Sequence, residues 1–212
     1  TSAQTTSTTM RIEKLLPPTP PAKTWTVALE GGKTLRVTES TVLDQGLFAG
    51  LELDEAALDT LRSAAASAAL RSRAVNLLSV RAMSAGQLNE KLMAKGATER
   101  QAAETVAWAV DIGLVNDAEY AKALVRHYQA KGYGLYKIKN ELYRRRVPKA
   151  YWEDALAEMD DAEDAIDAFL AKKLRDPEDR KECKKASDAL ARRGFSWSQI
   201  AAGIERRKYQ TD

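Results

Sequence analysis

Apolar residues recur at helical spacing along most of the chain, and one helical segment occurs in three related copies. In chain order, the copies are residues 86–97, 135–148 and 183–195. They align on Leu92, Leu142 and Leu190, which are separated by 50 and 48 residues, and each leucine follows an apolar or small residue by four positions. A period near 50 residues indicates a repeat array, in which each unit packs mainly against its neighbours.

Helix-capping signals divide this part of the chain into repeats of three helices. A capping box pairs a Ser, Thr or Asn with a Gln or Glu three residues later. Such boxes begin at Ser84, Thr98, Asn116 and Ser196. We therefore predict a mainly α fold of tandem three-helix repeats that stack into an elongated, curved body. The predicted repeats are residues 74–115, 116–159 and 160–208.

The segment before the repeats has a different pattern. Residues 1–22 combine Thr and Ser with four prolines, which predicts a flexible tail. From Trp25 to Val37, apolar residues alternate on both sides of Gly31-Gly32, which is typical of a β-hairpin with a tight turn. Asp54 then caps a helix that we expect to end near Ser72. Residues 23–73 are therefore predicted to form a small N-terminal β-hairpin plus helix.

Single residues exclude several kinds of chemistry. The chain has one histidine, His127, and one cysteine, Cys183, so the usual Cys/His zinc site cannot be assembled and no internal disulfide can form. His127 has no nucleophile or acid near it in the sequence. Lysines on both sides of Cys183 are expected to lower the pKa of its thiol. We predict no catalytic residues, no metal site and no cofactor, and hence a protein that is not an enzyme.

Charge is unevenly distributed along the chain, although the net charge is only +3. Residues 1–70 carry six Lys/Arg and eight Asp/Glu, whereas residues 71–212 carry 27 and 22. The excess of positive charge lies in residues 137–149, 172–185 and 192–208, and such patches favour a polyanionic partner. No apolar run is long enough for a membrane span, so we expect a cytoplasmic protein with no membrane partner.

The second helix of repeat 2 concentrates this positive charge. At about 100° per residue, Lys137, Asn140 and Arg144 lie roughly opposite its apolar face, and the matching residues of repeat 3 include Lys185 and Arg192. Cations beside an amide and an aromatic ring suit phosphates and stacked bases. The alternative is a solvated helix face whose arginines complement the helix dipole. The candidate binding residues are Tyr133, Lys137, Asn140, Arg144, Arg145, Arg146, Lys185, Arg192 and Arg193.

Four short motifs, in this order and spacing, resemble the RecX family of regulators of the bacterial recombinase RecA. They are Arg81-x-x-Ser84-x-x-x-Leu88-x-x-x-Leu92-x-x-x-Gly96, Gly113-Leu114-Val115-Asn116-Asp117-x-x-Tyr120-Ala121, Gly134-x-x-Lys137-Ile138-x-x-Glu141-Leu142 and Arg192-Arg193-Gly194-Phe195. The resemblance extends from the hairpin near Trp25 to Arg207. One departure is Arg146, which stands where such proteins usually carry glycine.

The resemblance implies a non-enzymatic modulator, mainly an inhibitor, that binds RecA–DNA filaments and restrains ATP hydrolysis and strand exchange. It places the protein in DNA repair, homologous recombination and the SOS response. The implied partners are the RecA nucleoprotein filament and single-stranded DNA, the latter bound weakly in isolation. Since the sequence has neither a heptad seam nor a long exposed apolar stripe, we expect a monomer.

Two other functions remain open at the level of the sequence. The first is an autonomous DNA-binding protein that uses residues 135–146 as a recognition helix; tight binding to naked DNA at physiological salt would identify it. The second is a scaffold with no nucleic-acid role, for which the arginines would have no effect.

Overall fold

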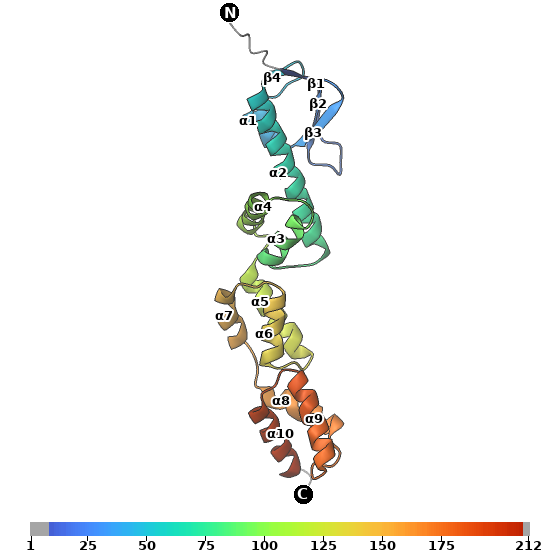
Figure 1. The fold of residues 1–212 in the computed structure, drawn as a ribbon, viewed down its shortest axis with the longest axis vertical. Helices are drawn as coiled ribbons and strands as arrows, with labels where there is room; N and C mark the ends of the chain where they lie inside the picture. The colour runs from blue at the N-terminus through green and yellow to red at the C-terminus, as the bar shows by residue number, and fades with distance from the viewer. Residues whose placement is uncertain (1–8, 210–212) are drawn as a thin grey trace, which may run out of the picture. The chain divides into compact units, whose positions relative to one another are not determined.

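The computed structural model describes residues 9–209, and these divide into two units (Figure 1). Unit 1 comprises the chain up to Val80 together with Lys91–Asp111. Unit 2 comprises Arg81–Glu90 and the chain from Ile112 onward. The first eight residues of the predicted flexible tail lie outside the described residues.

An antiparallel sheet of four strands opens unit 1, in the order β3-β2-β1-β4. The strands are β1 (Met10–Leu16), β2 (Trp25–Leu29), β3 (Lys33–Val37) and β4 (Glu52–Leu53). The predicted hairpin is confirmed as β2 and β3. Gly31 and Gly32 join these strands with φ angles of +82° and +79°, and glycine adopts such angles without steric cost.

The predicted tail is wrong for Met10–Leu16, because these residues form β1 and pair with both β2 and β4. Ile12 of β1 is fully buried in the core of unit 1, beside Val27 and Leu29 of the hairpin. The register shifts between Ile12 and Lys14. This irregularity interrupts the two-residue alternation by which a strand is recognised in a sequence.

Two helices complete the first core, α1 (Glu39–Asp44) and α2 (Glu55–Val80). Asp54 caps α2 as predicted, accepting a hydrogen bond from the Ala57 amide at 2.8 Å. The predicted helix boundary near residues 72–74 is wrong, because α2 continues through it as a single helix of 26 residues. No glycine or proline interrupts this stretch. Further along unit 1, α2 packs against α4 (Glu99–Asp111).

The repeats follow the predicted helices closely. After α3 (Ala85–Met93) and α4, the remaining helices are α5 (Asp117–Ala130), α6 (Leu135–Arg144), η1 (Lys149–Tyr151), α7 (Trp152–Ala157), α8 (Ala162–Lys173), α9 (Arg180–Arg192) and α10 (Trp197–Tyr209). The third helix of repeat 2 differs in detail, since it begins as the 3-10 turn η1. All four cap side chains accept from the amide three residues later; for example, Asn116 accepts from the Glu119 amide at 3.1 Å. The return bond that completes a capping box is present at Thr98 and Ser196, whose amides donate to Gln101 and Gln199 at 3.0 Å.

The mainly helical class with a small N-terminal β element is confirmed, and so is the burial of the leucines that define the repeat. Leu92, Leu142 and Leu190 each have 0% of their surface exposed. Leu142 lies in a core with Leu124, Val125 and Ile138. Leu190 occupies the corresponding core of α8, α9 and α10.

Leu142→Ala should lower the free energy of unfolding by about 2–5 kcal/mol, because the removed side chain leaves a cavity in a closed core. Urea unfolding followed by circular dichroism measures this change. The matched control is Leu135→Ala on the same helix, since Leu135 is exposed and its truncation should cost less than about 1 kcal/mol. Equal losses in the two variants would contradict the assigned core.

Candidate functional site

The site begins with a close joint in unit 2, where the N-terminus of α6 meets the C-terminus of α9. The Gly134 amide donates to the carbonyl of Arg193 at 2.8 Å, and the Tyr136 amide donates to the carbonyl of Gly194 at 3.1 Å. A Cβ on Gly134 would lie 2.5 Å from the Gly194 oxygen. The two backbones therefore touch only because both residues lack side chains, and the joint brings the side chains of α6 and α9 together.

A cleft of about 780 Å³ opens beside this joint. Its lining combines six cations, two aromatic rings and one acidic residue from α6, α8, α9 and the adjoining loops. The cationic and aromatic residues are Tyr133, Lys137, Phe169, Lys173, Arg175, Lys185, Arg192 and Arg193. The acidic residue, Glu182, accepts from the backbone amides of Arg175 and Asp176 at 3.0 and 3.1 Å. The cleft is therefore strongly positive.

The structure brings five of the nine predicted site residues into this cleft: Tyr133, Lys137, Lys185, Arg192 and Arg193. Among these residues, Arg193 contributes to packing. Its guanidinium lies 5.8 Å from the ring centre of Tyr133 and 5.0 Å from that of Phe169. It also donates to the Gly132 carbonyl at 3.3 Å. Arg193 thus fastens α9 to the loop before α6.

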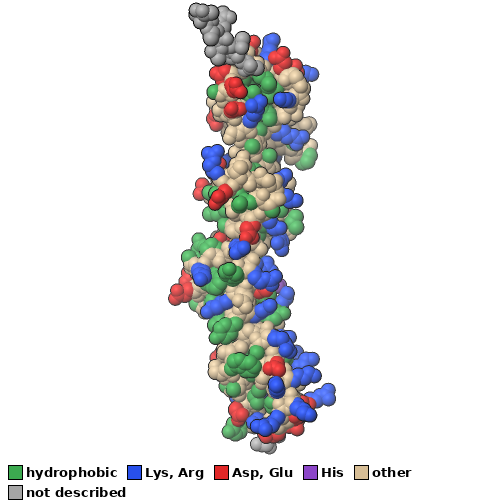
Figure 2. Space-filling model, viewed as in Figure 1, with side chains coloured by type: hydrophobic (Ala, Val, Ile, Leu, Met, Phe, Trp, Pro, Cys, Tyr) green, Lys and Arg blue, Asp and Glu red, His purple; other side chains and the backbone are tan. Residues whose placement is uncertain are grey.

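Lys185 and Arg192 are the cleft cations best placed to meet a ligand. Both are exposed, and neither makes an ion pair within residues 9–209. They also line a second hollow of about 320 Å³ on α9, together with Lys181, Lys184 and one acidic residue, Asp188. Figure 2 shows Lys and Arg side chains gathered along the edge of unit 2 where α9 lies. Lys185 and Arg192 therefore join two hollows into one basic strip.

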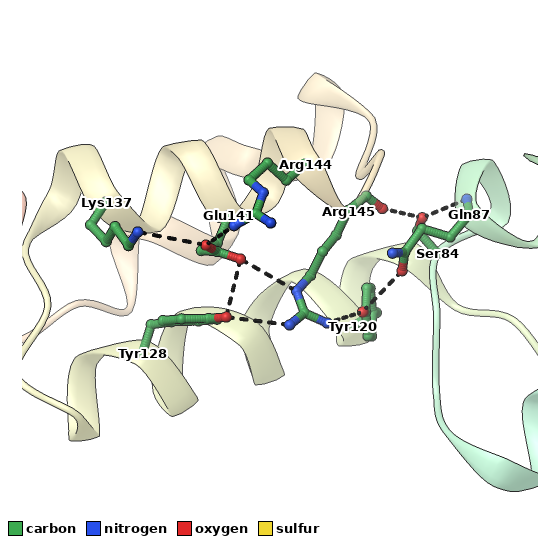
Figure 3. Close-up of polar contacts among 8 residues, drawn as sticks. All are labelled: Ser84, Gln87, Tyr120, Tyr128, Lys137, Glu141, Arg144 and Arg145. Atoms are coloured by element: carbon green, nitrogen blue, oxygen red, sulfur yellow. Dashed lines mark hydrogen bonds and ion pairs between the residues drawn. The ribbon is translucent and has the colours of Figure 1, made fainter.

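Lys137 and two arginines at the end of α6, Arg144 and Arg145, surround a buried carboxylate (Figure 3). Glu141 is 6% exposed and accepts from the Tyr128 hydroxyl at 3.1 Å and from Arg144 at 3.0 Å. Nitrogens of Lys137 and Arg145 lie 3.9 and 3.8 Å from its oxygens. Partners of this kind offset the cost of burying a polar side chain. Glu141 thereby offsets part of the positive charge of Lys137, Arg144 and Arg145, while its own side chain is hardly exposed.

Arg145 belongs to this network, and its side chain is only 29% exposed. Its guanidinium donates to the hydroxyls of Tyr120 and Tyr128 at 3.2 and 3.3 Å. Burial lowers the pKa of Arg145, but the two tyrosine hydrogen bonds outweigh it and the pKa is raised overall. Its carbonyl accepts from the Ser84 hydroxyl. Arg145 therefore holds the end of α6 to the start of α3.

Arg146 occupies the turn where glycine was expected. Its φ angle is +54°, in the left-handed region, and the Val147 amide closes the turn by donating to Leu142 at 3.1 Å. Gly194 makes the same turn after α9, with φ +91°. The side chain of Arg146 pairs with Glu90 at 2.7 Å. The departure from glycine therefore leaves the turn intact and adds an ion pair to α3.

Sequence reasoning missed several residues of this region. Lys173, Arg175 and Phe169 enter the cleft from α8 and the loop after it, and only the tertiary fold brings them there. Two exposed tyrosines of α6, Tyr136 and Tyr143, were also missed. A helical wheel would have found them, since they share the solvent-facing side with Asn140, which is exposed as predicted.

The structure offers little for other chemistry. Among the described residues, no group of three or more His, Cys, Asp or Glu could hold a metal ion, and no helix is long and apolar enough to cross a membrane. The expected effect of the lysines on Cys183 is wrong: burial is the largest influence, and the pKa of the thiol is raised. Its S–H donates to the Pro177 carbonyl at 3.1 Å.

Comparison with known proteins gives consistent results. Residues 116–156 match a family model described as RecX, second three-helix domain, and residues 160–202 match RecX, third three-helix domain. The chain is 31% identical over 134 residues to the Regulatory protein RecX of Vibrio parahaemolyticus, covering 62% of this chain and 86% of that one. It is 36% identical over 133 residues to that of Xanthomonas citri, covering 61% and 82%.

Solved structures resemble the fold. A crystal structure of a regulatory protein RecX has a TM-score of 0.76 at 22% identity, covering 92% of this chain and 99% of that one. RecX from Lactobacillus salivarius has a TM-score of 0.59 at 23% identity, covering 66% and 96%. At these identities the likeness extends to the fold alone.

Proposed function

Because the chain belongs to the RecX family of regulatory proteins, we propose that it is a non-enzymatic, monomeric modulator of RecA. It binds RecA–DNA filaments in the cytoplasm and restrains ATP hydrolysis and strand exchange, acting mainly as an inhibitor. Single-stranded DNA is a partner that it binds weakly in isolation.

The observation that carries this proposal is the basic strip of Lys185 and Arg192 beside the cleft. Both cations are exposed, whereas the one carboxylate in the cleft is engaged with backbone amides. Asp188 also lines the second hollow, but among the described residues it makes no ion pair with either cation. Exposed, unpaired cations are suited to phosphate oxygens, and such contacts position a protein on nucleic acid without reading its sequence. That property suits a regulator that must act along a filament of any sequence.

The autonomous DNA-binding reading is supported by the positive face of α6, but one feature opposes it. In helix-turn-helix proteins, the N-terminal residues of the recognition helix contact base edges in the major groove. In this protein the amides of Gly134 and Tyr136, at the start of α6, are bonded to the end of α9. The N-terminus of α6 is therefore covered, and α6 is poorly placed to enter a groove end-on.

A titration against preformed RecA filaments on single-stranded DNA tests the proposal. We expect the rate of ATP hydrolysis to fall as the protein is added, at concentrations where naked DNA of the same length is largely unbound at physiological salt. Naked DNA bound as tightly as filaments would favour the autonomous binder. No change in ATP hydrolysis or strand exchange would contradict the proposed function.

A further inference from the structure

The outer face of α6 carries two exposed tyrosines that do not contribute to the packing of the described fold. Tyr136 is 59% exposed and Tyr143 is 62% exposed. Within residues 9–209, neither ring packs against another ring or a cation, and neither hydroxyl makes a hydrogen bond. Seven residues separate them, so they lie on the same side of the helix, about 10 Å apart along its axis.

The charge around these rings has one sign. The charged residues of α6 are Lys137, Lys139, Glu141 and Arg144, and Glu141 is the buried carboxylate. At about 100° per residue, Lys139 lies on one flank of the tyrosines, whereas Arg144 and Lys137 lie on the other. The exposed face therefore presents two aromatic rings with Lys139 on one flank and, on the other, Lys137 and Arg144, which also lie 3.9 and 3.0 Å from Glu141.

We infer that this face of α6 is a stacking platform for the unpaired bases of a single-stranded nucleic acid. The inference rests on the proposed function, to which it adds the recognition of bases. Tyr136 and Tyr143 would each offer a ring to a base, while Lys137, Lys139 and Arg144 would contact the phosphates. Proteins that bind single strands combine aromatic platforms and a positive track in this way.

The composition of the face favours nucleic acid over a protein surface. Protein–protein interfaces are depleted in lysine, particularly at their cores, whereas lysines flank the tyrosines here. Paired bases in a duplex are already stacked on their neighbours, so an exposed ring gains a stacking contact only with an unpaired base. The predicted ligand is therefore single-stranded.

The test compares two oligonucleotides of equal length and charge, oligothymidylate and an abasic chain with the same backbone. We expect the parent protein to bind oligothymidylate more tightly in fluorescence anisotropy. Tyr136→Ala with Tyr143→Ala should lower that affinity about tenfold or more, and change affinity for the abasic chain little. The slope of affinity against salt should stay the same, because the phosphate contacts remain.

Two further variants control the test. Tyr136→Phe with Tyr143→Phe should keep most of the affinity, since phenylalanine preserves the stacking ring. Tyr209→Ala should change nothing, because Tyr209 is an exposed tyrosine whose neighbours Arg206 and Lys208 are paired with carboxylates. Circular dichroism checks that each variant is folded.

The outcomes separate this inference from the proposed function. Equal affinity of the parent for the two oligonucleotides, or no effect of the alanine variants, would overturn the stacking platform. Loss of RecA inhibition with unchanged oligonucleotide binding would also overturn it and identify a protein contact instead. If the parent had no effect on filaments but preferred oligothymidylate through these tyrosines, the platform would stand and the proposed function would fail.

Discussion

Lys185→Glu with Arg192→Glu should weaken binding to single-stranded DNA by roughly tenfold or more at moderate salt, and should reduce inhibition of RecA filaments. Both side chains are exposed at the junction of the two basic hollows on α9. The reversal replaces two phosphate contacts with repulsion. The slope of log affinity against log salt should fall by about two units, one for each lost contact.

The matched control for this reversal lies in unit 1. Arg62 and Arg100 are exposed on α2 and α4, and changing both to glutamate alters the net charge by the same amount. That variant should keep its inhibition and most of its salt slope. If both double variants lost affinity equally, overall charge would explain binding. If neither lost affinity while remaining folded, Lys185 and Arg192 would be ordinary solvated cations.

Gly134→Ala should destabilise unit 2 by about 2–4 kcal/mol, although it adds a single methyl group. The new Cβ would overlap the carbonyl of Gly194 and lie 2.8 Å from the Phe195 ring. Overpacking of this kind costs about 1–3 kcal/mol, and each of the two backbone hydrogen bonds of the joint adds about 1 kcal/mol if it breaks. Urea unfolding should also become less cooperative, because repeat stability depends on the interface between neighbours.

Gly46→Ala provides the comparison for this variant. Gly46 has a φ angle of +58° and nothing within 4 Å of an added Cβ, so alanine there incurs only backbone strain of about 1–2 kcal/mol. Gly134 has a φ angle of −87°, which any residue adopts, so its variant reports the contact alone. A loss at Gly134 no larger than at Gly46 would mean that the joint yields to an added side chain.

The repeated part of the fold could be predicted because its signals are local. Leucines at fixed spacing and side chains that cap their own helices lie within a few residues of one another. Strand β1 was missed because its alternation is interrupted after Ile12 and because one of its two partners, β4, lies more than 35 residues further along the chain. The continuity of α2 was missed since Arg73 and Ala74 carry no signal that separates a helix end from a helix interior.

The candidate site was predicted only where local signals in the sequence specify it. Helical periodicity places Lys137 and Arg144 on the polar side of α6, and the repeat alignment leads to Lys185 and Arg192. Neither signal can show that Arg145 is hydrogen-bonded to Tyr120 and Tyr128, because these tyrosines lie 25 and 17 residues away in the sequence. Reversing Arg145 would therefore put a carboxylate beside Glu141 and test the stability of the contact between the end of α6 and the start of α3 more than the contacts of the surface.

The N-terminus of α9 is satisfied differently from that of α6, and this limits how the array could be extended. Asp179 accepts from the Lys181 amide at 2.8 Å, so α9 is capped by its own side chain, whereas Gly134 leaves the start of α6 open to the next repeat. The repeat alignment places Ser84 at the position of Gly134 in repeat 1, where the Ser84 hydroxyl donates to the Arg145 carbonyl, so either a bare backbone or a small polar side chain can make this contact between repeats. In α9 the position of Gly134 is taken by Glu182, inside the first turn of a helix that begins about one turn earlier than α6 does in the same alignment. A designed fourth repeat would therefore require changes at both Asp179 and Glu182, because the start of α9 is longer as well as capped.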